Sequence, residues 1–446
     1  MPWSGRPVRP RAALSAIRSN RILRSNAIYL AGSLAAGALG YVFHFLTGRL
    51  LGPAQYAVIA SAVAALYILN MPALVVQIVS ARFTSVAAGR GQLGNVPGLL
   101  LQISGLGLAV GLLVSAGLLI FRAPLAAYLQ VSDQRVIAIL AASSLLAILV
   151  STTRGALQGL RRFVALSLNT ALDLGTRVAS AAALILAGLS TLGGLLALVI
   201  GPLVAYVASL FLFGAVRKAD RGARAPFRQV GGYAAMTTIA AVGTTYLFNV
   251  DVLLSKHYLV AAAAGIYAAA SVLGRVVYFL GVTVAAVMFP EVATLHARDE
   301  PHFHVVDLSL GLVGALAVGL AVTYAVVPGL VVLPFGSAFS PVKPYLWPFA
   351  LALGMLTVAN LLINYFLSIG SVRFAAPLVA ACILETGLIA VFHADPGQIL
   401  WMVVASMTAL AAVLGAMYLG DRLGMTSGIK LRGAAVVDDD RVVDKA

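Results

Sequence analysis

Charged side chains inside apolar runs are the most informative residues of this sequence. Arg275 lies at the centre of the apolar run 262–289. If that run spans a bilayer, a charge at its centre costs about 2.5–3.5 kcal/mol on insertion scales, so the guanidinium needs a partner. Its planar fork of donors suits a pyrophosphate or an acidic sugar, which makes Arg275 a candidate substrate-binding residue that faces a cavity. The alternative is a structural role, in which Arg275 pairs with a carboxylate on a neighbouring helix.

A second charged pair has a simpler interpretation. Asp173 and Arg177 stand four residues apart in the run 163–188. Residues at i and i+4 share one face of a helix, so these two charges can neutralise each other. We therefore interpret Asp173 and Arg177 as a structural pair.

Asp251 is a candidate for ion or proton coupling. It follows Asn249 at the end of the run 230–250, and Lys256 and His257 come after it. Carboxylates inside membranes often mark ion pathways. The other interpretation is an interfacial residue that reaches water.

Glu385 is the second coupling candidate. It lies in the run 374–392 and has no cation within its own helix. Unpaired carboxylates at depth often carry protons in pumps and transporters. Glu385 is alternatively protonated permanently, or it pairs with Arg177 or Arg275.

Several further residues are weaker candidates for substrate binding. Asn360 and Asn364 share a helical face at i and i+4. Amides inside membrane helices usually bond to neighbouring helices first and to ligands second. Arg49 either faces a cavity or reaches the outer interface. Together with Arg275, the predicted substrate-binding residues are Arg49, Asn70, Asn360 and Asn364.

Motifs for enzymatic chemistry are absent from the sequence. It has no G-x-x-x-x-G-K-[ST] loop, no H-E-x-x-H and no G-x-S-x-G. Cys382 is the only cysteine, which excludes an intrachain disulfide and a cysteine-rich metal site. His296, His302 and His304 lie near acidic residues, but a solvated loop is favoured over a metal site. We predict a protein that is not an enzyme and that has no cofactor and no metal, driven by an ion gradient, the membrane potential or consumption of substrate.

Composition identifies the solvent that surrounds most of the chain. The 446 residues are 61% hydrophobic and only 10% charged, whereas soluble domains are about half apolar and a quarter charged. The formal net charge of +15 comes from short basic clusters between apolar runs, and not from one basic domain. This pattern favours a membrane protein over a nucleic-acid-binding one.

Apolar runs of spanning length predict an all-α membrane protein with about twelve transmembrane helices. The predicted helices are 27–48, 55–80, 97–121, 134–152, 163–188, 191–214, 230–250, 262–289, 305–331, 345–368, 374–392 and 396–419.

Basic residues test this topology independently. Most of them fall in segments on one side of the membrane, and the other side holds only Arg49, Arg122, Arg135, Lys256 and Lys343. This bias follows the positive-inside rule and places both termini in the cytoplasm.

Two local matches indicate an internal duplication. The segment "LGPAQYAVIA" from Leu51 resembles "LVAAAAGIYAAA" from Leu259, and "QGLRRF" (158–163) resembles "IGSVRF" (369–374), at similar offsets of about 208 and 211 residues. Repeats with an even number of helices are parallel and enclose a cavity between them. The predicted divisions are a basic arm (1–25), a six-helix bundle (26–216), a basic linker (217–229), a second six-helix bundle (230–419) and a disordered tail (420–446).

Three segments resemble polysaccharide flippases of the multidrug/oligosaccharidyl-lipid/polysaccharide exporter superfamily. They are "GRLLGPAQYAVIASAVA", "LQGLRRFVALSLNTALDLGTRV" and "FNVDVLLSKHYLVAAAAGIYAAASVLGRVVYFLGVTVAAVMFPEVATLHA". The resemblance implies a bacterial inner-membrane protein that flips a polyprenyl-pyrophosphate-linked oligosaccharide to the outer leaflet for cell-surface polysaccharide synthesis. It also implies two six-helix bundles around a central cavity lined chiefly by the first, second, seventh and eighth helices. The implied partners are the lipid-linked oligosaccharide, membrane lipids, and glycosyltransferases or a polymerase of the same pathway.

Two alternative functions stay open. An ion-coupled drug/cation antiporter of the same superfamily predicts a cavity rich in carboxylates and aromatic residues. An integral membrane glycosyltransferase or polymerase needs a sizeable outside loop or a catalytic His/Asp pair, and the outside loops predicted here are short.

Overall fold

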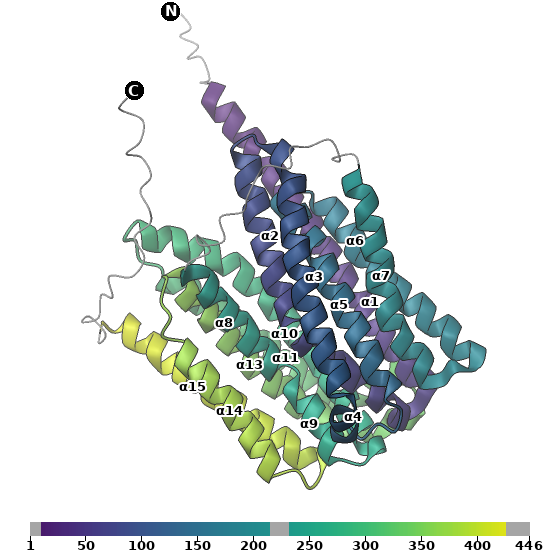
Figure 1. Ribbon diagram of the computed structural model, residues 1–446. Helices are drawn as coiled ribbons and strands as arrows, with labels where there is room; N and C mark the ends of the chain where they lie inside the picture. The colour runs from purple at the N-terminus through teal and green to yellow at the C-terminus, as the bar shows by residue number, and fades with distance from the viewer. Residues whose placement is uncertain (1–9, 215–231, 425–446) are drawn as a thin grey trace, which may run out of the picture. The chain divides into compact units, whose positions relative to one another are not determined.

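The computed structural model describes residues 10–214 and 232–424. Within these ranges all regular elements are helices and none is a strand (Figure 1). The predicted all-α membrane fold class is confirmed. The predicted basic linker (217–229) and most of the predicted disordered tail lie outside the described residues.

Ten helical stretches in the described ranges are long and apolar enough to cross a membrane. One of them, Phe163–Phe211, is 49 residues long, about twice the ~20 residues that one crossing needs. The backbone turns inside this stretch, where Gly188 and Ser190 have φ of 94° and 49°, so the stretch makes two crossings. The shorter apolar helix Ala375–Val391 completes the twelve predicted crossings.

The described residues form two compact units. The first unit contains α1 (Pro10–Leu69), α2 (Met71–Gly89), α3 (Val96–Ile120), α4 (Arg122–Tyr128), α5 (Arg135–Gly159), α6 (Phe163–Leu184) and α7 (Ser190–Gly214). It also includes two segments from later in the chain, Val252–Val272 and Gly329–Lys343. The central helix is α5, which packs against α2, α3 and α7.

The first two crossings meet without a loop. Although α1 is continuous by hydrogen bonding, its backbone leaves the helical region at Gly52, where φ is 71° and ψ is 173°. Glycine adopts this φ at no steric cost, and Pro53 is suited to begin the next helix because its missing N–H is not needed there. The second crossing therefore runs from Pro53 through the break at Asn70 to the end of α2.

The second unit contains the remaining crossings. Its helices are α8 (Gly232–Leu247), the start of α9 (Val250–Tyr258), the larger part of α10 (Ala261–Ala297), α11 (Phe303–Val326), α13 (Leu346–Ser368), α14 (Ala375–Val391) and α15 (Pro396–Arg422). The short helix α12 (Pro328–Val332) leads into the segment that belongs to the first unit. The central helix is α13, which packs against α8, α11 and α15.

The two halves of the sequence repeat one packing pattern. The pairs α3–α5, α5–α7, α6–α7 and α1–α6 of the first unit correspond to α11–α13, α13–α15, α14–α15 and α8–α14 of the second. The second crossing (53–89) and α10 are offset by about 208 residues, the offset of the longer sequence match. Both observations are those that a duplication predicts.

An ion pair joins two segments at one end of the second unit. Arg373, in the loop before α14, donates a hydrogen bond to the carboxylate of Asp421 at the end of α15. This hydrogen bond raises the pKa of Arg373 above its ordinary value, so the guanidinium stays charged. Asp307 on α11 pairs in the same way with Arg422 at 3.1 Å.

Candidate functional site

The first unit holds an ion cluster inside the membrane-spanning helices. The Asp173 carboxylate on α6 lies between two guanidiniums: Oδ1 is 2.7 Å from Arg177 Nε, and Oδ2 is 2.9 Å from Arg154 Nη2. The contact with Arg177 is the one expected from the i, i+4 spacing. Arg154 was not among the predicted site residues, because the sequence placed it in a loop. It lies on α5, which continues to Gly159.

Asn169 and Gly201 complete this cluster. The Asn169 side chain accepts from Arg154 Nε at 2.8 Å and donates to the Ala205 carbonyl on α7 at 2.8 Å. A Cβ on Gly201 would lie 2.6 Å from Asp173 Oδ1 and 2.3 Å from Arg177 Cγ. Because glycine has no side chain, α7 can approach α6 closely enough to enclose the ion pairs.

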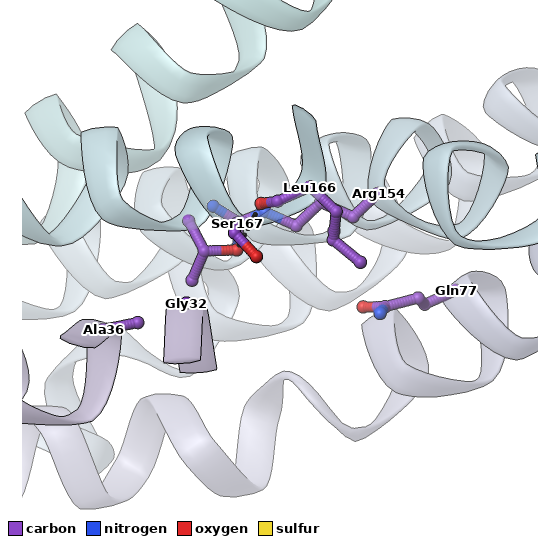
Figure 2. A pocket seen from close by; sticks show the side chains of 7 residues that line it. Gly32, Ala36, Gln77, Arg154, Leu166 and Ser167 are labelled. Atoms are coloured by element: carbon purple, nitrogen blue, oxygen red, sulfur yellow. Dashed lines mark hydrogen bonds between the residues drawn. The ribbon is translucent and has the colours of Figure 1, made fainter. Parts of the chain in front are cut away.

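A cavity of about 280 Å³ adjoins the cluster. Its lining residues are Gly32, Ala36, Gln77, Arg154, Leu166, Ser167 and Thr170. Figure 2 shows Arg154 and Ser167 on one wall, Gln77 on another, and Gly32 and Ala36 of α1 beside them. The cavity therefore lies among α1, α2, α5 and α6 inside the first unit, and a guanidinium borders it.

The second unit holds two buried carboxyl groups. Glu385 on α14 is 0% exposed; its Oε2 accepts from Ser406 Oγ at 3.4 Å, and its Oε1 has no hydrogen-bond partner among the described residues. Asp251 is 4% exposed and acts electrostatically on Glu385. Because this side chain is buried, it does not reach water in this structure, contrary to the interfacial interpretation. Arg275, which belongs to the same unit, forms no ion pair with Glu385 in the described ranges.

Two neighbouring carboxyl groups in an apolar interior have a restricted chemistry. Each carboxylate disfavours ionisation of the other, and a cation bound near them would favour it. A buried charge without a partner is also costly. The arrangement of Asp251 and Glu385 is thus suited to hold a proton or a small cation.

Arg275 is held inside the second unit. Its side chain is 6% exposed, and Nη2 donates to the Phe248 carbonyl at 2.9 Å and to Asn249 Oδ1 at 3.2 Å. The guanidinium carbon lies 4.4 Å from the centre of the Phe248 ring, a cation–π distance. We expected Arg275 either to face a cavity or to pair with a carboxylate. The structure gives Nη2 a carbonyl and an amide oxygen and places the guanidinium over an aromatic ring, while the buried Nε has no hydrogen-bond partner among the described residues.

The remaining predicted residues are divided between the two units, Arg49 and Asn70 in the first and Asn360 and Asn364 in the second. Asn70 accepts from Ser144 Oγ at 2.9 Å and so links α2 to α5. Asn364 donates to the Asn360 carbonyl at 2.8 Å, within α13. The Arg49 side chain is exposed. In this structure the amides act first as hydrogen-bonding groups between or within helices, as expected for their type.

Two contacts that the sequence did not reveal attach the later segments to the first unit. Lys256, only 3% exposed, donates to the Gln130 carbonyl at 3.3 Å, and the His257 ring stacks on Tyr128 at 4.1 Å. Lys256 was predicted in an outside segment, where a lysine normally reaches water.

The second attachment is aromatic. Phe335 and Phe339 pack against Tyr56 with ring centres 5.5 and 5.6 Å apart. These pairings join residues about 280 positions apart in the chain, so no local pattern could predict them.

Solved structures of other proteins share the fold of this chain. No protein-family model and no curated protein matches the sequence. Among solved structures, an inward-facing multidrug resistance MATE family transporter of the MOP superfamily matches with a TM-score of 0.75 at 11% identity, covering 88% of this chain and 96% of that chain. A eukaryotic MATE transporter gives 0.62 at 13% identity, with coverage of 89% and 96%. The lipid II flippase MurJ gives 0.67 at 14% identity, with coverage of 89% and 87%.

The chain has the fold of this MOP-superfamily transporter. The resemblance that three sequence segments showed to this superfamily is thus confirmed at the level of the fold, over most of the chain. The MOP fold, together with the apolar helices, identifies a multi-pass integral membrane protein. Identities of 11–14% concern the fold, and the chemistry of the sites must come from the residues of this chain.

Proposed function

We propose that this protein is a flippase that moves a polyprenyl-pyrophosphate-linked oligosaccharide across a bacterial inner membrane by alternating access. Its neighbours in structure include a lipid II flippase as well as multidrug transporters, so the fold is compatible with lipid substrates. The product would serve cell-surface polysaccharide synthesis, and glycosyltransferases or a polymerase would act before and after the flipping step. Both termini would lie in the cytoplasm.

The observation that carries this proposal is the sign of the charge in the first unit. Its described acidic residues are Asp133 and Asp173. Asp133 pairs with Arg135 at an exposed end, and Asp173 is bound by both Arg154 and Arg177. The membrane-embedded part of this unit therefore has more guanidiniums than carboxylates. Such a unit favours an anionic substrate such as a pyrophosphate.

Coupling would use the carboxyl pair of the second unit. Asp251 and Glu385 would take up a proton or a cation on one side of the membrane and release it on the other, as buried carboxylates do in transporters. Arg275, Arg49, Asn70, Asn360 and Asn364 stay predicted substrate ligands. Arg275 would first have to leave the Phe248 carbonyl and Asn249 before it could bind a phosphate.

An ion-coupled drug/cation antiporter is the second candidate. The same buried pair, Asp251 and Glu385, favours it, because carboxylates inside a membrane protein can bind a cation. The two functions predict opposite substrate charges, so one experiment separates them.

The test uses purified full-length protein in proteoliposomes. A fluorescent polyprenyl-pyrophosphate oligosaccharide is added, and a membrane-impermeant quencher reports how much label changes leaflet. We expect flipping above that of protein-free vesicles, and Arg154→Gln to slow it, whereas Arg135→Gln, which alters only the exposed pair, retains it. Uptake of a lipophilic cation without any flipping would refute the flippase and support the antiporter. Accumulation of polyprenyl-linked glycans in a deletion strain, measured by mass spectrometry, would identify the glycan.

A further inference from the structure

We propose that the cavity beside Arg154 is a binding site for a phosphate group, carried by a lipid or free in solution. This inference rests on the proposed function and adds to it the place where the anionic headgroup first binds. The site lies wholly inside the first unit, among α1, α2, α5 and α6. It shares the first and second crossings with the central cavity that the family resemblance implies, but its other two walls are α5 and α6, where the resemblance implies the seventh and eighth helices.

Charge balance is the first argument. Arg154 and Arg177 share the single carboxylate of Asp173, so the cluster has one unneutralised guanidinium. The other described acidic residue of the unit, Asp133, is 48% exposed in its side chain and pairs with Arg135, so it cannot neutralise this charge. The Arg154 side chain is only 16% exposed, and a largely buried guanidinium is costly without a counter-ion. An anion in the cavity would supply the missing charge.

Free hydrogen-bonding atoms on the cavity wall are the second argument. Arg154 uses Nε for Asn169 and Nη2 for Asp173 and the Asn169 carbonyl, which leaves Nη1 without a partner in the described structure. Ser167 Oγ is buried and makes no hydrogen bond there. A buried hydroxyl without a partner is uncommon in folded proteins. Both Arg154 and Ser167 border the same cavity. Ser167 Oγ is enclosed beside Gly32 in this structure, so Arg154 Nη1 is the donor that a phosphate oxygen meets first, and the Ser167 hydroxyl donates once its side chain turns toward the cavity.

Gln77 adds a hydrogen-bond acceptor to the cavity wall and so restricts the kind of ligand that can bind. Its Nε2 donates to Gln158 Oε1 at 3.2 Å, so the amide is anchored at the cavity wall and Oε1 stays available as an acceptor. An acceptor beside two donors suits a phosphate that carries a proton or a bridging water. The volume of about 280 Å³ is roughly nine times the ~30 Å³ that one water occupies in the liquid. It therefore accommodates a phosphate group with several waters.

The short distance of the cavity from the α5–α6 loop favours a lipid as the molecule that carries the phosphate. Arg154 lies five residues before the end of α5 at Gly159, and Ser167 lies four residues after the start of α6 at Phe163. At 1.5 Å per residue, both side chains sit about 6–8 Å from the α5–α6 loop. The headgroup zone of a bilayer is about 5–8 Å thick on each side of the hydrocarbon core. If the loop marks the membrane surface, the cavity lies at the boundary between the headgroup zone and the hydrocarbon core, where a lipid phosphate can reach it.

The experiment measures binding without transport. Native mass spectrometry of the full-length protein, released from detergent, is run with dioctanoyl phosphatidate, with dioctanoylglycerol as the uncharged analogue, and with inorganic phosphate. We expect retention of phosphatidate and not of dioctanoylglycerol. Arg154→Gln should weaken phosphatidate binding about tenfold or more, since it removes a charge-assisted hydrogen bond. Arg162→Gln, an exposed arginine near the same loop, should bind as the wild type does.

Further measurements distinguish a lipid phosphate from free phosphate, and loss of binding from loss of folding. Ser167→Ala leaves the ion cluster intact and should weaken binding a few-fold, so the inference stays testable if Arg154→Gln fails to fold. Arg154-dependent binding of inorganic phosphate alone would identify a free anion as the ligand. Equal phosphatidate binding by wild type, Arg154→Gln and Ser167→Ala, or equal binding of dioctanoylglycerol, would overturn the site. If that result came with intact flipping in proteoliposomes, the proposed function would stand, whereas phosphate binding without flipping would refute the function alone.

Discussion

Replacing Asp173 with asparagine should destabilise the first unit strongly. The Asp173 side chain is 4% exposed and contacts Arg154 and Arg177, whose side chains are 16% and 23% exposed. Asparagine keeps the size and removes the charge, which leaves two guanidiniums facing each other in the interior. Removing one partner of a buried pair typically costs about 3–5 kcal/mol. We expect the lower end, about 3 kcal/mol, because both arginines keep some exposure.

The measurement must report on the first unit. The tryptophans of the described residues, Trp347 and Trp401, belong to the second unit, so tryptophan fluorescence is unsuitable. Size-exclusion chromatography after heating in detergent gives an apparent melting temperature for the whole chain. For units of 150–250 residues, 1 kcal/mol changes Tm by about 2–4 °C, so the expected loss is about 6–12 °C.

Two further variants make this prediction refutable. Asp133→Asn breaks an exposed pair of 3.6 Å and should lower stability by at most about 1 kcal/mol. Adding Arg154→Gln to Asp173→Asn removes one of the unpaired charges and should restore part of the loss, a coupling that a double-mutant cycle measures. An Asp173→Asn variant as stable as Asp133→Asn, or one that Arg154→Gln weakens further, would contradict the charge argument.

Three other variants test separate features. Glu385→Gln should fold normally but abolish the dependence of flipping on an imposed ion or pH gradient, since its amide cannot titrate; retained gradient dependence would exclude Glu385 from coupling. Gly48→Val should loosen the segment Gly329–Lys343, because a Cβ on residue 48 would lie 2.5 Å from the Phe335 ring. Hydrogen exchange of the backbone amides in that segment should then be faster than in the control Gly40→Val, where the added Cβ meets nothing within 4 Å. Lys256→Met should leave thermostability unchanged or raise it. Lys256 is buried, and its ammonium group has one hydrogen-bond partner among the described residues, the Gln130 carbonyl. A clear loss of stability would show that its charge is needed.

The predicted helices agree with the structure because their signal is local. A run of about twenty apolar residues has to cross the bilayer as a helix, since unpaired backbone groups are not tolerated in lipid. Even the break between the first two crossings has local causes in Gly52 and Pro53. Helix ends are less well predicted: α5 continues to Gly159, where the apolar run suggested an end near 152. This difference of two turns is why Arg154 was assigned to a loop.

The candidate sites were predictable only in part. Asp173 with Arg177 follows from spacing alone, because i and i+4 face the same way on any helix. The electrostatic interaction of Asp251 with Glu385, and the position of Arg275 over Phe248, depend on which helices pack together. Spacing along one helix carries no information about the neighbour across it, so the sequence left several partners open for each of these residues.

The sequence by itself determined that this chain is an all-helical membrane protein with about twelve crossings and two repeated halves, because hydropathy, helix length and repeat offset are properties of the chain read in order. Tertiary structure alone decided which charges meet. It placed Arg154 against Asp173, buried Asp251 near Glu385, and joined Val252–Val272 and Gly329–Lys343 to the first unit. The physical reason is that a buried charge is stabilised by atoms within a few ångströms of it, and in a helical bundle most of those atoms come from distant parts of the sequence.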